Sequence, residues 1–464
     1  MTDLPEGWQL TLLGEIGFVQ SGMGFPNEYQ GSISGAYPVY KVGDVSRGVT
    51  QNNGKLQVAT NYVSTEVAEI LKGHIFDTGS TLFAKIGEAL KLNRRGFVVN
   101  PGLADNNVMG FKSVTGINDR FIYYFLRTQN FAEYSRSTTV PSIRKGDIEN
   151  VQIALPPSAE QTRIAAKLDE LLAQVDTLKA RIDGIPALLK RFRQSVLAAA
   201  VSGRLTEEWR IRCFPGSISR TKGGWQEISI ENLCKDEKYS LAIGPFGSNL
   251  KVTDYRLEGK PLVFVREIRA EKFGDEKTKF ITPEKFSELK PHQVFAGDIL
   301  ITKMGDPPGD VAVYPDNALD AVLTADCIKV SINESLATRK FTYFQMKSDL
   351  FRTRVKAISA GVAQQKVSLG NFRKLKLWVP PLDEQTEIVR RVEQLFAFAD
   401  QLEARVAAAQ ERIDKLTQSI LAKAFRGELV PQDPNDEPAS VLLERIKAQR
   451  AAAPKAKRGR KAKA

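Results

Sequence analysis

Apolar residues recur at alternating intervals of four and three along two long stretches of the chain, which begin at Ile164 and at Ile388. This spacing places them on one face of a helix and is typical of helices that pack as a coiled coil. The residues expected at the helix contact are Ile164, Leu168, Leu171, Val175, Leu178 and Ile182 in the first stretch, and Ile388, Val392, Leu395, Leu402, Val406, Ile413 and Leu416 in the second.

The two stretches are copies of one another. Residues 155–205 align with residues 379–429 without a gap, and 19 of the 51 aligned pairs are identical. Each copy begins with a Pro-Pro pair, which ends the preceding strand, and closes at Gly203 or Gly427, where a helix stop is expected. Gly184 and Pro186 predict a kink or break in the first helix only.

We expect the two helices to pair with each other rather than with helices of another chain, because two segments of one chain lose less entropy when they meet. Antiparallel pairing would relate the two halves of the chain by a pseudo-two-fold axis. Each helix would be about 53 Å long at 1.5 Å per residue.

The regions outside the heptads form two globular domains that echo each other weakly. Short strand-like runs closed by glycine, with one or two helices, predict an α+β fold in both. Polar residues between the shared framework positions differ almost completely, which favours two modules that read different targets. The predicted organisation is a first domain (1–154), a helical spacer (155–210), a second domain (211–378), a second helical spacer (379–430) and a C-terminal extension with a short helix and a basic tail (431–464).

Composition narrows the class of partner. The net charge of +12 over 464 residues favours an anionic partner, above all nucleic acid. No apolar run is long enough to cross a bilayer and no signal segment opens the chain, so a cytoplasmic location is expected. With three scattered cysteines and two histidines, no metal site is expected.

Motifs of catalysis are absent from the sequence. No GxxxxGK[ST] phosphate loop is present, and two distant histidines do not suit a Ser-His-Asp triad or a metal hydrolase. The run from Asp306 to Gly309 is similar to the Asp-Pro-Pro-aromatic motif of adenine methyltransferases, but it lacks the aromatic residue that stacks a flipped base. A self-sufficient DNA methyltransferase and a coiled-coil adaptor without DNA preference stay open as alternatives.

Several motifs resemble the specificity subunit of type I restriction-modification systems. They are the Pro-Pro-x-x-Glu-Gln-Thr helix starts at 156–162 and 380–386, the segment 416–429 and the stretch 438–448, and together the resemblance covers nearly the whole chain. It implies two target-recognition domains, held apart by the helices, that each read one half of a bipartite, asymmetric sequence in double-stranded DNA. It also implies that the helices dock two modification subunits and that restriction (motor-nuclease) subunits complete the complex. S-adenosylmethionine, ATP and Mg would then be bound by those partners, and this chain would carry neither a cofactor nor catalysis.

Base reading requires side chains that reach groove edges, namely Arg or Lys to guanine, Asn or Gln to adenine, and Ser or Thr to either. The polar loop before the last strand of each domain is the first candidate, and segments after the middle strands are the second. The candidates in the first domain are Asp44, Arg47, Lys85, Lys91, Arg94, Arg95, Ser137, Thr138, Thr139, Ser142, Arg144 and Lys145. Those in the second are Arg266, Arg269, Lys303, Ser359, Gln364, Gln365 and Lys366.

Overall fold

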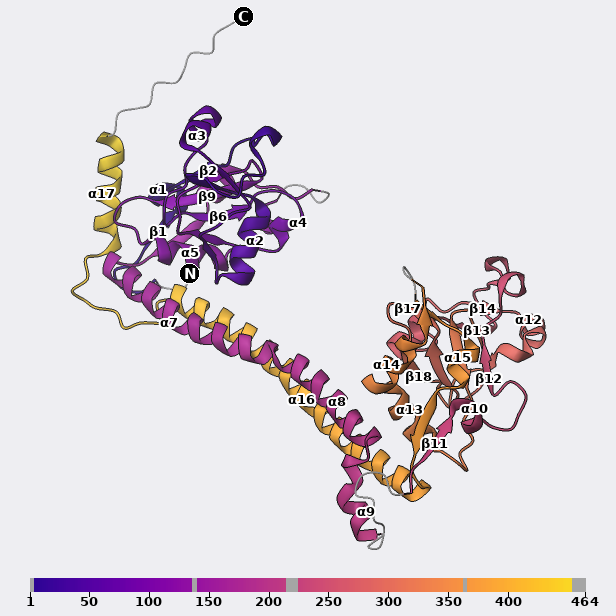
Figure 1. Cartoon of the computed structure of the whole chain (residues 1–464). Coiled ribbons are helices and arrows are strands. Elements are labelled where there is room, and N and C mark those ends of the chain that lie inside the picture. Colours follow the sequence, from indigo (N-terminus) through magenta and orange to yellow (C-terminus); the bar gives the residue numbers. More distant parts are fainter. Residues whose placement is uncertain (1–3, 136–139, 214–223, 362–364, 453–464) are drawn as a thin grey trace, which may run out of the picture. The chain divides into compact units, whose positions relative to one another are not determined.

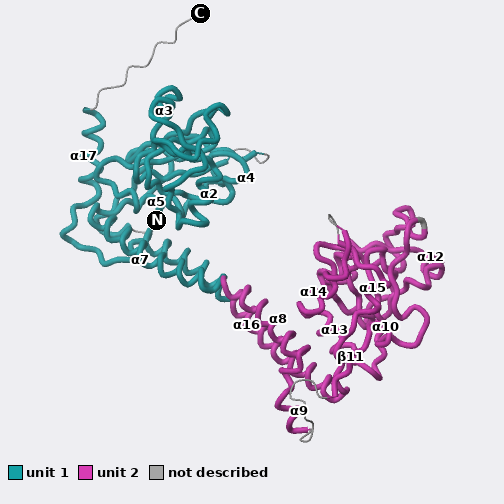
Figure 2. Tube along the Cα trace, in the orientation of Figure 1, with its two compact units in different colours: residues 1–183, 408–464 teal, residues 184–407 magenta. Residues whose placement is uncertain are grey.

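The computed structural model describes residues 4–135, 140–213, 224–361 and 365–452. The chain divides into two compact units, one formed by residues 1–183 and 408–464 and the other by residues 184–407 (Figure 2). Unit 1 is therefore built from both ends of the sequence, and unit 2 from its middle. Each unit combines a globular part, called domain 1 or domain 2 here, with a stretch of paired helices (Figure 1).

Domain 1 contains a five-stranded sheet of order β2-β9-β6-β7-β4, a three-stranded sheet of order β5-β3-β8 and the strand pair β1-β10. The strands are β1 Gln9–Leu12, β2 Gly17–Ser21, β3 Tyr37–Tyr40, β4 Lys55–Leu56, β5 Asn61–Val63, β6 Thr81–Ala84, β7 Gly96–Val98, β8 Leu103–Ala104, β9 Val108–Ser113 and β10 Gln152–Leu155. The helices of unit 1 that lie wholly within it are α1 Leu13–Ile16, α2 Val42–Gln51, α3 Thr65–Leu71, α4 Glu88–Lys91, α5 Asp119–Thr128, α6 Lys145–Glu149, α7 Ser158–Asp183 and α17 Ala439–Ala452.

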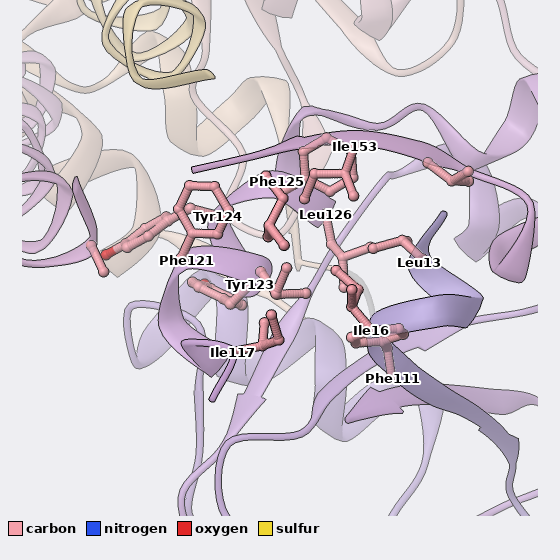
Figure 3. Close-up of a cluster of buried hydrophobic side chains, with 14 of the residues drawn as sticks. Leu13, Ile16, Phe111, Ile117, Phe121, Tyr123, Tyr124, Phe125, Leu126 and Ile153 are labelled. Carbon is pink, nitrogen blue, oxygen red and sulfur yellow. The ribbon is translucent and has the colours of Figure 1, made fainter. Parts of the chain in front are cut away.

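The core of unit 1 forms around α5, whose apolar side chains are almost all buried (Figure 3). The Asn118 side chain caps this helix by accepting from the backbone N–H groups of residues 120 and 121. Phe425, at the end of the second long helix, packs against Phe121 and Phe125 with ring centroids 5.3 and 5.5 Å apart. The second helical copy is thus part of the first domain's core.

Domain 2 contains sheets of order β12-β20-β16-β18, β14-β13-β19-β15 and β17-β22-β21, and the strand pair β11-β23. The strands are β11 Gln226–Ser229, β12 Leu241–Ile243, β13 Lys260–Val263, β14 Phe280–Ile281, β15 Gln293–Val294, β16 Ile299–Thr302, β17 Met304–Gly305, β18 Val311–Val313, β19 Ala321–Leu323, β20 Cys327–Val330, β21 Ser359–Ala360, β22 Gln365–Val367 and β23 Lys376–Val379. The helices are α8 Ile185–Val201, α9 Glu207–Cys213, α10 Ile230–Leu233, α11 Val265–Ala270, α12 Pro283–Glu288, α13 Arg339–Lys347, α14 Asp349–Ala357, α15 Leu369–Arg373 and α16 Leu382–Phe425, the last of which continues into unit 1.

The two domains share one topology. The strand order β2-β9-β6 of domain 1 corresponds to β12-β20-β16 of domain 2, and β5-β3-β8 corresponds to β14-β13-β19. In both, the first strand pairs antiparallel with the last, β1 with β10 and β11 with β23. The predicted α+β fold and the similarity of the two globular parts are confirmed.

The predicted pairing of the helices is confirmed within each unit. In unit 1, α7 packs antiparallel against the end of α16, with Lys179 2.9 Å from Asp414 and the Gln410 amide 2.7 Å from Asp183. In unit 2, α8 packs against the beginning of α16, where Arg193 lies 2.9 Å from Glu403. The pseudo-two-fold relation between the halves stays a prediction.

The expected heptad contact is correct only in part. Most of its positions are buried or half-buried, but Leu178 and Leu416 are 48% and 45% exposed, while Leu172 and Leu421, outside the predicted set, are buried. A straight α-helix drifts about 20° per heptad away from a strict 3.5-residue repeat, so some heptad positions turn out of the contact while neighbouring positions turn into it. The buried predicted positions are Ile164, Leu168, Val175, Ile388, Val392 and Ile413, and the half-buried ones are Leu171, Ile182, Leu395, Leu402 and Val406.

The predicted helix ends are confirmed. The first long helix breaks between Asp183 and Ile185, whereas α16 runs through its 44 residues without interruption. Gly203 and Gly427 follow the ends of α8 and α16 with φ of 80° and 76°, the left-handed conformation that glycine adopts at little cost. No helix of the described ranges is long and apolar enough to cross a membrane.

Candidate DNA interface

A tryptophan–glutamate joint fixes domain 1 to its long helix. Trp8 Nε1 donates to Glu160 Oε2 at 3.1 Å, and both residues are buried. The neighbouring Gln161 accepts from the backbone N–H of Asn118 at 2.9 Å and donates to the carbonyl of Pro156 at 2.9 Å. Through Glu160 and Gln161, the start of α7 is therefore hydrogen-bonded to Trp8 near the beginning of domain 1, to Asn118 before α5, and to Pro156 after β10.

The same joint recurs in domain 2. Trp225 Nε1 donates to Glu384 Oε2 at 3.0 Å, while Gln385 accepts from the backbone N–H of Thr338 at 2.7 Å and donates to the carbonyl of Pro380 at 2.8 Å. From the sequence, Glu160/Gln161 and Glu384/Gln385 were expected in the first helical turns, where they suit the helix dipole, and as parts of the family motif, but not as links to the domains. Gly-Trp and Glu-Gln both occur in each half of the chain, and this repetition was the signal that could have revealed the joint.

The two joints differ in charge balance. Glu384 also forms a buried ion pair with Arg210 of α9, at 2.5 Å with side chains 2% and 3% exposed, and accepts from Thr206 at 2.8 Å. Glu160 has no such cation within ion-pair distance in the described part of the chain, and its Oε1 has no hydrogen-bond partner. Burial therefore raises the pKa of the Glu160 carboxyl above its ordinary value, against the opposing effect of the Trp8 hydrogen bond.

In domain 1 the polar loop before the last strand lies against the segment that follows β6. Ile86 and Ser142 form an antiparallel bridge, Ile143 N donates to the carbonyl of Lys85 at 3.0 Å, and Gly87 N donates to the carbonyl of Pro141 at 2.8 Å. The backbone therefore brings Lys85 beside the candidates Ser142 and Arg144. Ser142 and Arg144 are exposed.

Domain 2 builds the corresponding surface as the sheet β17-β22-β21. Met304 pairs with Lys366, Gly305 with Gln365, and Ala360 with Lys366. This sheet places the candidates Ser359, Gln365 and Lys366 on neighbouring strands, and Lys303, directly before β17, accepts through its carbonyl from the backbone N–H of Val367 at 3.0 Å. The predicted loop and the predicted mid-strand segment thus converge on one surface in each domain.

The side chains of Asp44 and Arg95 are buried. The prediction that they contact DNA directly is therefore wrong in this structure. Asp44 accepts from the backbone N–H of Lys41 at 2.9 Å and of Thr60 at 2.9 Å, so it caps α2 from inside the domain. Arg95 is 2% exposed, donates to the carbonyl of Leu126 at 3.0 Å, and stacks on the Phe131 ring with 3.8 Å to its centroid. Both are structural charges.

Lys303 is also buried, at 4% exposure, so the prediction that it contacts a groove edge directly is wrong for this conformation. Its ammonium donates to the carbonyl of Ala325 at 3.3 Å and lies 4.5 Å from the Phe246 ring centroid. Burial, with the nearby charge of Lys366, lowers the pKa of this ammonium.

The remaining basic candidates lie at or near the surface, several with carboxylate partners. Arg47 pairs with Asp44, Lys91 with Glu88 at 2.8 Å, Lys145 with Glu149 at 3.5 Å and Arg266 with Glu267 at 2.9 Å, while Arg94 is half-buried. Ser137, Thr138, Thr139 and Gln364 lie outside the described residues. Phe246, which no pattern in the sequence singled out, is 60% exposed, and its ring is the one that lies beside the Lys303 ammonium.

The comparisons with known proteins agree with this architecture. The model of the type I restriction modification DNA specificity domain matches residues 5–187 and 263–410, which together make up most of the chain. The chain belongs to the type I restriction-modification specificity subunits. It is 31% identical to the EcoKI specificity subunit of Escherichia coli strain K12, with 91% of this chain and 97% of that protein aligned. It is 32% identical to the EcoDI specificity subunit of Escherichia coli, with 99% and 98% aligned.

Two solved structures share the fold of this specificity subunit. The HsdS subunit from Thermoanaerobacter tengcongensis aligns over 92% of this chain and 98% of its own, with a TM-score of 0.54 and 19% identity. A chain solved in a study of complex assembly and conformational transition of a type I R-M system aligns over 92% and 100%, with a TM-score of 0.63 and 17% identity. The role in DNA sequence specificity follows from the family. Family membership also supports a non-catalytic subunit rather than the self-sufficient methyltransferase considered above.

Proposed function

We propose that domain 1 and domain 2 each read one half of a bipartite, asymmetric sequence in double-stranded DNA, and that the paired helices set the unread spacer. One observation carries the proposal: the Trp–Glu and Gln–backbone hydrogen bonds of the joint recur in both domains, whereas the segments at matching places near the surface carry different residues. Ser142 and Arg144 are exposed in domain 1, whereas the matching place in domain 2 holds the half-buried Gln365 and the exposed Lys366. A shared scaffold with different exposed polar groups suits two modules with different targets.

Two copies of one modification subunit would dock on the helices. Several large apolar side chains of the helices are 45–54% exposed, namely Leu178, Leu188, Phe398 and Leu416. Exposed apolar residues on long helices are typical of surfaces that a partner covers. These partners would bind S-adenosylmethionine and methylate adenine at N6, and motor-nuclease subunits would use ATP and Mg to cut unmodified DNA.

A methylation map tests the proposal. The methylated adenines of a host that carries the complete system are sequenced, first with this chain and then with a chimera whose residues 1–154 come from the EcoDI specificity subunit. The expected result is a bipartite motif of which the chimera changes one half and keeps the other half and the spacer. A motif that changes on both sides would contradict independent reading by the two domains.

The adaptor alternative predicts a different result. An adaptor without DNA preference would leave methylation scattered, with no common motif around the modified adenines. A self-sufficient methyltransferase would transfer label from S-adenosylmethionine to DNA when the purified chain is incubated alone. The proposal expects no transfer by the chain alone and sequence-specific transfer once the modification subunits are added.

A further inference from the structure

Arg269 of α11 lies at the surface of domain 2 and forms an ion pair with Asp310. Its Nε donates to Asp310 Oδ2 at 3.0 Å, while Arg352 Nη2 donates to the other oxygen, Oδ1, at 3.0 Å. Asp310 is 19% exposed, and the Arg269 side chain is 55% exposed. Because Asp310 engages only Nε, both terminal nitrogens of the Arg269 guanidinium lack a partner within the described part of the chain.

Gly305 leaves the space for this guanidinium. A Cβ on Gly305 would lie 3.1 Å from Nη2 of Arg269. The guanidinium therefore packs against the face of β17 where Gly305 has no side chain. Gln365 is the cross-strand partner of Gly305. Directly opposite residues of an antiparallel pair project to the same face of a sheet, so Gln365 projects to the face on which Arg269 lies.

The same face carries further polar groups without full partners. The Oε1 of Gln365 is buried and has no hydrogen-bond partner, so a movement of this amide toward a ligand breaks no bond at that atom. The Lys303 ammonium lies two residues before Gly305, is buried, and has no carboxylate within ion-pair distance among the described residues. Buried cations normally have a counter-charge inside a protein, and buried acceptors normally have a hydrogen-bond donor. That Lys303 and Gln365 lack these partners points to a ligand rich in hydrogen-bonding groups.

We propose that Arg269 reads a guanine in the half-site recognised by domain 2, with Gln365 contacting the neighbouring base. The inference rests on the proposed function and adds the base and the residue that selects it. The two free terminal nitrogens form the planar fork that matches O6 and N7 of guanine in the major groove. Asp310 fixes the direction of that fork before DNA arrives, which reduces the entropy lost on binding. Lys303 does not touch the base; its buried ammonium supplies a positive charge beneath the surface that Arg269 and Gln365 present to DNA.

A phosphate contact by Arg269 is the competing explanation, and methylation kinetics separate the two. The complex with the modification subunits is assembled with the wild-type chain, Arg269→Ala, Arg269→Lys and the control Arg339→Ala. The control removes an arginine of the same domain that is paired with Asp316 at 2.6 Å. Each complex is assayed on a DNA library randomised in both half-sites, and the chimera described above shows which half-site belongs to domain 2.

For the wild type, we expect guanine at one position of that half-site to be preferred roughly 10- to 100-fold over the other bases. Arg269→Ala should accept all four bases there within about threefold, with every other position and the other half-site unchanged. Arg269→Lys keeps the charge but not the fork and should retain a weaker preference for guanine. Arg339→Ala should keep the wild-type motif. Thermal melting of each variant checks that domain 2 remains folded.

Three results would overturn the inference while the proposed function stands. The first is a domain 2 half-site that contains no guanine. The second is an Arg269→Ala or Arg269→Lys complex that keeps the wild-type base preference. The third is an Arg269→Ala complex that loses activity equally on all sequences and shows a smaller salt dependence, which is the sign of a lost phosphate contact. A wild-type complex without any bipartite motif would instead overturn the proposed function together with this inference.

Discussion

Replacing Glu384 by glutamine should destabilise unit 2 far more than the matching change of Glu160 destabilises unit 1. In unit 2 the substitution removes the charge that balances Arg210, a guanidinium that is 3% exposed. The backbone carbonyl of Gly203, 2.8 Å from Arg210 Nη2, stays in place but carries no charge. Breaking a buried ion pair by removing one partner costs about 3–5 kcal/mol, and this range is the expected loss.

Glu160→Gln should change the stability of unit 1 by no more than about 1 kcal/mol, because the amide oxygen can still accept from Trp8 and no buried cation loses its counter-charge. The pH dependence gives a second observable. Burial raises the folded-state pKa of Glu160 above its ordinary value of 4.5. The stability that this carboxyl contributes is therefore fully present below pH 4.5 and is lost as the pH rises through the raised pKa. Glu160→Gln removes that dependence, so its stability relative to the wild type should improve on going from pH 4 to pH 7.

Hydrogen exchange followed by mass spectrometry measures both effects in the full-length chain, because peptides from 158–172 and 382–396 report on the two joints separately. Urea unfolding gives the total for each variant. Equal losses for the two substitutions, or a loss below about 1 kcal/mol for Glu384→Gln, would refute the assignment of the Arg210 ion pair as the stabilising difference between the joints.

Three further outcomes are expected. Leu172→Ala should cost about 2–5 kcal/mol in urea unfolding, whereas Leu178→Ala should cost less than about 1, because the first side chain is 5% exposed and the second 48%; similar losses would contradict the revised helix contact. Arg95→Ala should lower the free energy of unfolding by about 2–4 kcal/mol without altering the methylated motif, because its guanidinium donates to the carbonyls of residues 126 and 129. An altered motif would show that Arg95 contacts DNA after all. Removing one turn (four residues) from α8 and from the facing part of α16 shortens the helix pair by about 6 Å. The unread spacer in the DNA site should then shorten by about two base pairs. A methylation map with changed half-site sequences would refute the proposal that the helices set only the spacer.

The elements that the sequence predicted best are those with a long repeating pattern. The heptads located both helices, and the Gly184–Pro186 segment located the break, because each depends on local backbone preferences. The exposure of Leu178 and Leu416 was not predictable from the same pattern, since it depends on how far each helix drifts from the contact.

The candidate site was predicted as segments rather than as residues. The loop before the last strand and the segment after the middle strand were both identified, and their pairing follows from the strand register. Arg94 and Arg95 are adjacent and chemically identical, yet only Arg95 is buried, which depends on the position of α5. The Arg269–Asp310 pair joins residues 41 positions apart, and no spacing rule connects them.

The C-terminal helix α17 determines when domain 1 can be completed during synthesis. The backbone N–H of Ala439 donates to the carbonyl of Gly7 at 2.9 Å, and Arg450 donates to the carbonyls of Gly14 and Gly17 at 2.6 and 3.0 Å. Domain 1 therefore waits for α17, which is synthesised after the whole of unit 2, while unit 2 is continuous and can close earlier. Translation at about 5–20 residues per second makes the wait between Asp183 and the end of α17 roughly 13–54 seconds, during which the apolar side chains that α17 covers are open to chaperones.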